Sequence, residues 1–192
     1  MIFIDGSNLL CEISRRYDLG YTENYKPPPA SLLTLADTLI NRAIDAGSAS
    51  FNLIRSYWFG SIQGDDASVR ATEQRLRELK YEPRLIKKPS AQRLEKGVDL
   101  ALGIEMLVHA FHQNYDIGIL IAGDKDYVQL VDEVKRFGQV VWGMFFATEA
   151  IGELPFDEFR EIQSSTSDAH DTVESLLERV RQDLDCIRKG GA

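Results

Sequence analysis

Four aspartates stand where their carboxylates could act together on a phosphate group. Asp5 ends the apolar run IFID, and Asp124 and Asp126 follow the apolar run that ends in IAG. Asp99 opens an otherwise apolar stretch, in which an unpaired charge would be costly. Carboxylates that converge repel one another unless a cation neutralises them. Mg²⁺ or Mn²⁺ suits such oxygen ligands and activates water for phosphoryl chemistry, and no histidine points to zinc instead.

Asp5, Asp124 and Asp126 also have a purely structural interpretation, as residues of turns and helix caps. Asp5 begins the turn-forming segment DGSN, in which Ser7 or Asn8 could cap a helix. Asp124 could cap a helix in the same way, because a strand that ends in Gly-Asp commonly leads into one. The metal-site hypothesis therefore depends on the set of four acids and not on any one of them.

Apolar runs alternate with helical patterns along the chain. The runs predict strands at residues 1–5, 52–59, 82–87, 116–123 and 139–146. Helices are predicted at residues 31–47 with Ser31 as the cap, at 67–79, at 98–112 as a mostly buried helix, and at 126–138. This alternation predicts a doubly wound α/β fold with a parallel sheet flanked by helices. The first and fourth strands would then deliver Asp5 and Asp124 to the carboxyl end of the sheet, where sites of such folds lie.

The last part of the chain predicts a helical tail. A polar linker, QSSTS, precedes a helical pattern at residues 168–189. Its apolar residues form one stripe: Val173, Leu176, Leu177, Val180, Leu184 and Ile187. The stripe predicts docking on the same domain or on a second copy, which would give a homodimer through the C-terminal helix. We therefore divide the chain into a domain at 1–162 and a tail at 163–192.

Composition narrows the class of protein. The 192 residues are 44% hydrophobic and carry a net charge of −8, which is typical of one globular domain and unlike a protein that coats DNA nonspecifically. Residues 149–192 hold 11 acids and 5 bases, so the preceding part is less acidic. The two cysteines have no partner at metal-binding spacing. With no apolar run of membrane-spanning length and no signal-like start, we expect a cytoplasmic protein without a membrane partner.

Residues 81–97 are the most basic stretch, with five bases against two acids. Lys88, Arg93 and Lys96 in this stretch, together with Lys125, are candidate contacts to a phosphate backbone. Trp58, in SYWFG at the predicted end of a strand, could stack on an unpaired base. The alternatives are a solvated loop for the basic residues and core packing for the tryptophan.

Three segments in order, FIDGSNL, KGVDLALGIEML and IAGDKDYVQLV, resemble the signature blocks of the NYN domain. This family is a branch of the PIN-like ribonuclease superfamily and includes LabA-like bacterial proteins. The resemblance runs from residue 1 to about residue 162 and includes ELPFDEF, which is similar to the family's closing segment. It implies a PIN-like fold and a metal-dependent ribonuclease.

The resemblance also implies roles for single residues. Asp5, Asp99 and Asp124 match the metal-binding carboxylates. Asp126 matches a further acid of the same site, and Asn8 would orient a carboxylate or a water. Lys96 matches the lysine of the KGVD block. Lys125 and Tyr127 depart from the family pattern, which usually has Ser and Phe at these two positions.

These observations predict an endoribonuclease that uses Mg²⁺ or Mn²⁺ to hydrolyse single-stranded or structured RNA. The alternative is a noncatalytic RNA-binding or regulatory adaptor with the same fold. A phosphatase of the haloacid dehalogenase type fits less well, because Ser7 stands where that chemistry needs a second acid.

Overall fold

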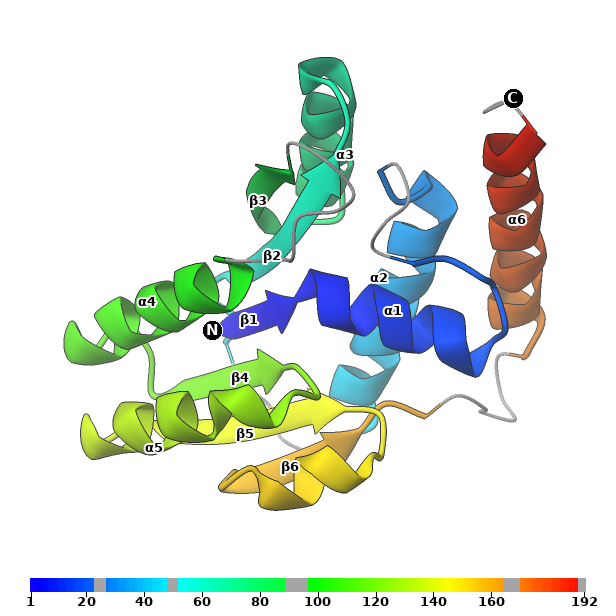
Figure 1. The fold of residues 1–192 in the computed structure, drawn as a ribbon. Coiled ribbons are helices and arrows are strands. Elements are labelled where there is room, and N and C mark those ends of the chain that lie inside the picture. The colour runs from blue at the N-terminus through cyan, green and yellow to red at the C-terminus, as the bar shows by residue number, and fades with distance from the viewer. Residues whose placement is uncertain (23–26, 48–51, 89–96, 164–169, 190–192) are drawn as a thin grey trace.

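A computed structural model describes residues 1–22, 27–47, 52–88, 97–163 and 170–189. Its centre is a parallel sheet of six strands (Figure 1). The strands are β1 (Ile2–Asp5), β2 (Ser56–Gln63), β3 (Glu82–Lys88), β4 (Ile117–Ile121), β5 (Val140–Phe145) and β6 (Glu158–Glu161). The predicted α/β fold with a parallel sheet is thus confirmed.

Helices form layers around this sheet. They are α1 (Gly6–Arg16), α2 (Ala30–Asp45), α3 (Asp66–Glu78), α4 (Val98–Phe111), α5 (Val128–Arg136) and α6 (His170–Lys189), with short 3₁₀ helices η1 (Lys125–Tyr127) and η2 (Glu149–Glu153). Helix α2 contacts both α1 and α3, whereas α4 contacts α5. These two groups cover opposite faces, as right-handed crossovers in opposite directions along the sheet require.

The direction in which the chain adds strands reverses between β1 and β4. The order is β3-β2-β1-β4-β5-β6, so the chain proceeds from β1 toward one edge and from β4 toward the other. Strands β1 and β4 pair directly, with Ile4 opposite Ile121. In doubly wound sheets, ligands bind outside the carboxyl ends of the strands at such a reversal. The ends of β1 and β4 are therefore the place to look for a site.

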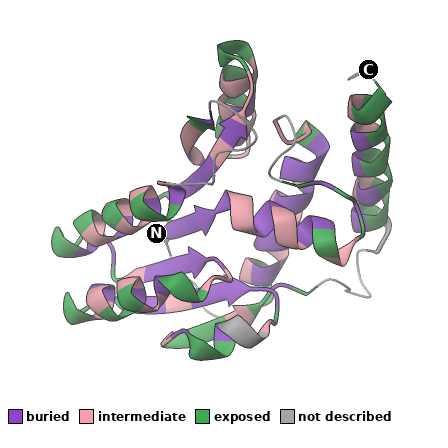
Figure 2. Cartoon of the chain, viewed as in Figure 1, coloured by how far each residue is buried: buried purple, intermediate pink, exposed green. Residues whose placement is uncertain are grey.

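The core lies between the sheet and its helices. All four residues of β1 are buried, as are the last four of β4, which is expected of central strands covered on both faces (Figure 2). Phe3, the central aromatic of β1, stacks on Tyr57 of β2 with ring centroids 5.6 Å apart. Continuous apolar packing of this kind holds the carboxyl end of β1 in a fixed position.

Several predicted elements differ from those in the structure. Strand β2 starts four residues later than its predicted start and continues to Gln63, because its pairing with β3 extends that far. Helix α2 begins at Ala30 after Pro29, so Ser31 is not its cap. The hydroxyl of Ser31 instead donates a hydrogen bond to Asp183, 2.6 Å away in α6. Strand β6 was not predicted, since its sequence EFRE is short and polar.

Helix α4 is less buried than predicted. One of its faces packs in the core through Leu102 and Met106. The opposite face leaves a stripe of apolar side chains 48–67% exposed: Leu100, Ile104, Val108 and Phe111. The sequence is apolar on both faces, and the fold covers only one of them.

The tail helix α6 packs on α2 of its own chain (Figure 1). Four residues of the predicted stripe are buried in this contact: Val173, Leu177, Val180 and Leu184. Of the two docking modes left open by the sequence, the structure has the one within the chain. No helix in the described ranges is both long and apolar enough to cross a membrane.

Candidate functional site

Asp5 is a buried charged residue at the end of β1, with 4% of its surface exposed. It is the N-cap of α1, and its Oδ1 accepts a hydrogen bond from the Asn8 backbone N–H at 3.0 Å. The sequence offered Ser7 or Asn8 as the cap of this helix, whereas the structure has Asp5 itself in that role. The cap uses only one carboxylate oxygen, however, and the other faces a second part of the chain.

The second oxygen of Asp5 meets Tyr127, the last residue of η1. The Tyr127 hydroxyl lies 2.9 Å from Asp5 Oδ2 and 3.0 Å from Asp99 Oδ1. These two carboxylate oxygens are therefore no more than about 6 Å apart. Asp99 lies in the first turn of α4, so residues from three distant parts of the chain meet at one hydroxyl group.

Helix α4 starts in a way that depends on Gly97. This residue is the N-cap and has φ of 113°, a left-handed conformation that side-chain-bearing residues rarely adopt. The turn sets the direction of the first helical residues, and Asp99 is the acid among them. In the KGVD segment, Gly97 thus allows the backbone conformation of the turn, whereas Asp99 contacts the Tyr127 hydroxyl.

Asp124 enters the site region on the turn after β4. Its Oδ1 accepts a hydrogen bond from the Asp126 backbone N–H at 3.0 Å, so it caps η1. The preceding Gly123 donates its N–H to the side-chain oxygen of Asn8 at 2.9 Å. Asn8 therefore ties the end of β4 to the start of α1, beside Asp5. Gly123 also packs closely on the Phe145 ring, leaving no room for a side chain.

The electrostatics around Tyr127 favour its neutral form. Burial raises the pKa of the Tyr127 hydroxyl far above its ordinary value, and the negative charges of Asp5 and Asp99 raise it further. The hydroxyl therefore stays protonated and acts as a hydrogen-bond donor. It has one proton, so it can donate fully to only one of the two carboxylates at a time.

The donor set fits a hard divalent cation in kind. Asp5 and Asp99 supply carboxylate oxygens close to one another, with Asp124 on the adjoining turn. Within the described part of the chain, no group of three or more acids, histidines or cysteines is close enough to hold an ion by itself. Mg²⁺ commonly needs only one or two protein carboxylates, with waters and substrate phosphates as its other ligands. The pair Asp5 and Asp99 meets that requirement.

The other predicted site residues lie at different depths. Asp126 and Lys125 are exposed on η1, at the surface beside Asp124. Lys88, the last residue of β3, is 8% exposed. Arg93 and Lys96 lie outside the described residues. Two further bases of the same stretch are engaged within the protein: Arg84 pairs with Glu82 and Glu105, and Lys87 pairs with Asp66.

Trp58 is not an open stacking surface in this structure. It lies in the middle of β2 and is 2% exposed, since the strand does not end where the sequence predicted. Its ring packs against Tyr81 with centroids 5.4 Å apart, and Gly6 at the start of α1 lies directly on the indole. The core-packing alternative is correct, so we do not assign Trp58 a contact to RNA.

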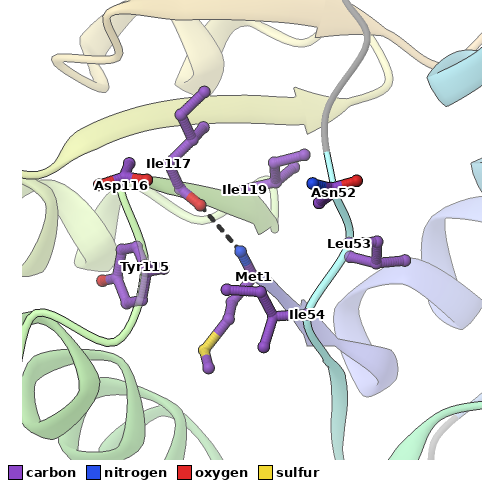
Figure 3. A pocket seen from close by; sticks show the side chains of 8 residues that line it. All are labelled: Met1, Asn52, Leu53, Ile54, Tyr115, Asp116, Ile117 and Ile119. Atoms are coloured by element: carbon purple, nitrogen blue, oxygen red, sulfur yellow. Dashed lines mark hydrogen bonds between the residues drawn. The ribbon is translucent and has the colours of Figure 1, made fainter.

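A hollow of about 530 Å³ lies at the other end of the strands. Its lining includes Met1 before β1 and Ile117 at the start of β4, and the Met1 amino group donates to the Ile117 carbonyl at 2.9 Å (Figure 3). Asp5 and the turn after β4 are at the opposite, carboxyl ends of the same strands. The hollow is therefore separate from the group of aspartates.

Sequence reasoning missed the part played by Tyr127. The sequence marks it only as a departure from a pattern, because its contacts join residues 28 and 122 positions away. The one available signal was its place three residues after Asp124, where a single helical turn brings it back toward the strand ends.

Comparisons with known proteins identify the family and support the fold. A family model described as the NYN domain matches residues 1–165. A solved structure of a protein of unknown function from Vibrio parahaemolyticus, VPA0982, is similar in fold, with a TM-score of 0.55 and 17% sequence identity. The similarity covers 85% of this chain and 91% of that one. A search of curated proteins found no match.

Proposed function

Because this chain belongs to the NYN domain family, a branch of the PIN-like nuclease superfamily, we propose that it is a metal-dependent endoribonuclease. The family match covers most of the chain and supports the sequence resemblance. Membership of the LabA-like branch stays a prediction.

One observation carries the proposal. Asp5 and Asp99, which are 94 positions apart in the sequence, contact the same hydroxyl group at the carboxyl end of the central strands. Two carboxylates at this short distance repel each other unless a cation or a protonated group lies between them. Their chemistry and their place at the reversal of strand order both favour a site for a cation and a phosphate.

We assign the residues as follows. Asp5 and Asp99 hold a Mg²⁺ or Mn²⁺ ion, and Asp124 completes the acidic rim on the adjoining turn. When bound, such an ion stabilises charge on phosphate oxygens and lowers the pKa of a water. Asn8 keeps the Gly123 turn against the start of α1, so that the acids of the two strands stay together. Asp126 is exposed on η1, at the entrance to the proposed site, where it orients the attacking water or completes the site.

RNA would approach over the exposed rim of η1. Lys125 is exposed there and can contact a phosphate, and the basic segment that contains Lys88, Arg93 and Lys96 precedes Asp99 in the sequence. The chain as a whole is acidic, so this local group must provide the attraction to the RNA backbone. Binding should accordingly weaken as salt concentration rises.

A noncatalytic RNA-binding adaptor is the second candidate. It is favoured by the finding that, among the residues described, no three metal-binding side chains form a closed group. The two functions differ in a simple assay. Purified protein is incubated with labelled RNAs and single-stranded DNAs in Mn²⁺, Mg²⁺ or EDTA, and both binding and cleavage are recorded. Metal-dependent cleavage of RNA supports the nuclease, whereas tight binding of RNA that stays intact supports the adaptor.

A further inference from the structure

Tyr127 connects all three acids of the proposed site. Its hydroxyl contacts Asp5 and Asp99, and its backbone N–H donates to the carbonyl of Asp124 at 3.3 Å. The side chain is 3% exposed, so its position is set by packing and not by solvent. A single residue thus links the end of β1, the turn after β4 and the first turn of α4.

The three acids differ in how firmly the backbone holds them. Asp5 ends a buried central strand and caps α1, so its carboxylate is held by the sheet and the helix together. Asp99 is exposed and lies on the opening turn of α4, two residues after a glycine in a left-handed conformation. The Tyr127 hydroxyl lies 3.0 Å from the Asp99 carboxylate and 2.9 Å from that of Asp5, so it helps to set how the two acids lie relative to each other.

We propose that Tyr127 is a positioning residue that holds the Asp99 carboxylate at a set distance from Asp5 and thereby prepares the pair to bind a divalent cation. The inference rests on the proposed function, because it concerns the same cation. A hydrogen bond to a ligating carboxylate orients the ligand, and removal of such a bond typically lowers metal affinity by about 10- to 100-fold. The phenol suits this task since it donates one hydrogen bond and adds no charge of its own.

The test is the variant Tyr127→Phe, which removes the hydroxyl and keeps the ring. Tyr81→Phe is the matched control, because the Tyr81 hydroxyl is also buried and also donates to a carboxylate, Asp37, at 2.8 Å. Titration calorimetry measures Mn²⁺ affinity in the absence of RNA. We expect the affinity of Tyr127→Phe to fall by about tenfold or more, and that of Tyr81→Phe to equal the wild type.

Hydrogen exchange of the metal-free proteins provides a second readout that needs no cation. Loss of the link should speed exchange in the first turn of α4 in Tyr127→Phe, with no change there in Tyr81→Phe. Equal Mn²⁺ affinity in the wild type and Tyr127→Phe would overturn the positioning role, and so would unchanged exchange at the start of α4. A wild type that binds no Mn²⁺ would overturn the proposed metal site itself, while the exchange data would still decide whether Tyr127 holds Asp99.

Discussion

At the scale of single residues, two interpretations that the sequence presents as alternatives, helix cap and proposed metal ligand, can apply to the same aspartate. Asp5 and Asp124 both cap helical turns, and each does so through one oxygen, Oδ1. A cap of this kind uses one of the two carboxylate oxygens. For Asp5 the second oxygen faces Tyr127 and, through it, Asp99. Cap chemistry at the end of a central strand is therefore compatible with a metal site and does not argue against one.

The residues of the site could be predicted only in part. Asp5, Asp99 and Asp124 are recognisable because charged residues interrupt apolar patterns, and such interruptions are visible in one sequence. Tyr127 and the depth of Trp58 are not recognisable in this way. A phenol that bridges two distant acids, or an indole under a glycine, depends on tertiary packing that local patterns do not contain.

Asn8→Ala tests the link between the two central strands at residue scale. The variant removes the acceptor of the Gly123 N–H, so we expect the free energy of unfolding to fall by about 1 kcal/mol and the proposed cleavage to slow. Urea denaturation and initial rates measure the two effects. Asn114→Ala is the control, since that amide contacts His109 at the surface. Full activity and unchanged stability in Asn8→Ala would contradict a structural role for this hydrogen bond.

At the scale of helices and strands, predicted identities were right more often than predicted ends. All five predicted strands exist, and the apolar runs of the central pair, β1 and β4, are buried on both faces. The predicted end of β2 was wrong, because the strand continues past Trp58 through its pairing with β3, which the local sequence does not reveal. The prediction that α4 is mostly buried was wrong for a related reason. Apolar periodicity shows that a face of a helix is apolar, but it does not show that another element covers that face.

Gly6→Ala tests how closely α1 starts against β2. A Cβ at this position would overlap the Trp58 indole and lie 2.8 Å from the carbonyl oxygen of Phe59. The backbone must then shift, and we expect a loss of about 1–3 kcal/mol in stability together with slower cleavage, because Asp5 is the preceding residue. Thermal melts and RNA cleavage measure this. Gly152→Ala is the control, as nothing lies within 4 Å of its added methyl group; equal effects of both substitutions would refute the close-packing argument.

Leu177→Ala tests the docking of α6 on α2. Leu177 is 4% exposed, so its truncation leaves a cavity and should cost about 2–5 kcal/mol. The exposed neighbour Glu178 provides the control, since Glu178→Ala should change stability by no more than about 0.5 kcal/mol. A Leu177→Ala protein as stable as the wild type would mean that α6 is not docked in solution.

At the scale of the whole molecule, three buried tyrosine hydroxyls make the free energy of unfolding depend on pH in the alkaline range. Burial raises the pKa of Tyr81, Tyr115 and Tyr127 above the ordinary value. In the unfolded chain these groups lose their protons near pH 10, while the folded protein retains them. Stability is therefore complete below about pH 10 and decreases as pH rises above it, by up to about 1.4 kcal/mol per pH unit for each tyrosine.

Urea denaturation at a series of pH values measures this dependence. Tyr115→Phe should show a shallower decrease than the wild type above pH 10, because one buried phenol has been removed. A folded protein in which all seven tyrosines gain tyrosinate absorbance near pH 10 would contradict the burial of these three.

RNA cleavage by an isosteric double variant is the decisive test of whether the acids at the carboxyl end of the sheet hold a catalytic cation. Asp5→Asn with Asp124→Asn keeps both helix caps, because Asn also accepts a backbone N–H, but removes two negative charges. Asp132→Asn with Asp185→Asn makes the same charge change at exposed positions on α5 and α6. We predict that the wild type and the surface variant cut RNA with Mn²⁺ or Mg²⁺ and not with EDTA, and that the Asp5/Asp124 variant folds normally without cutting. Cleavage that continues in EDTA, or in the Asp5/Asp124 variant, would contradict this role of the acids.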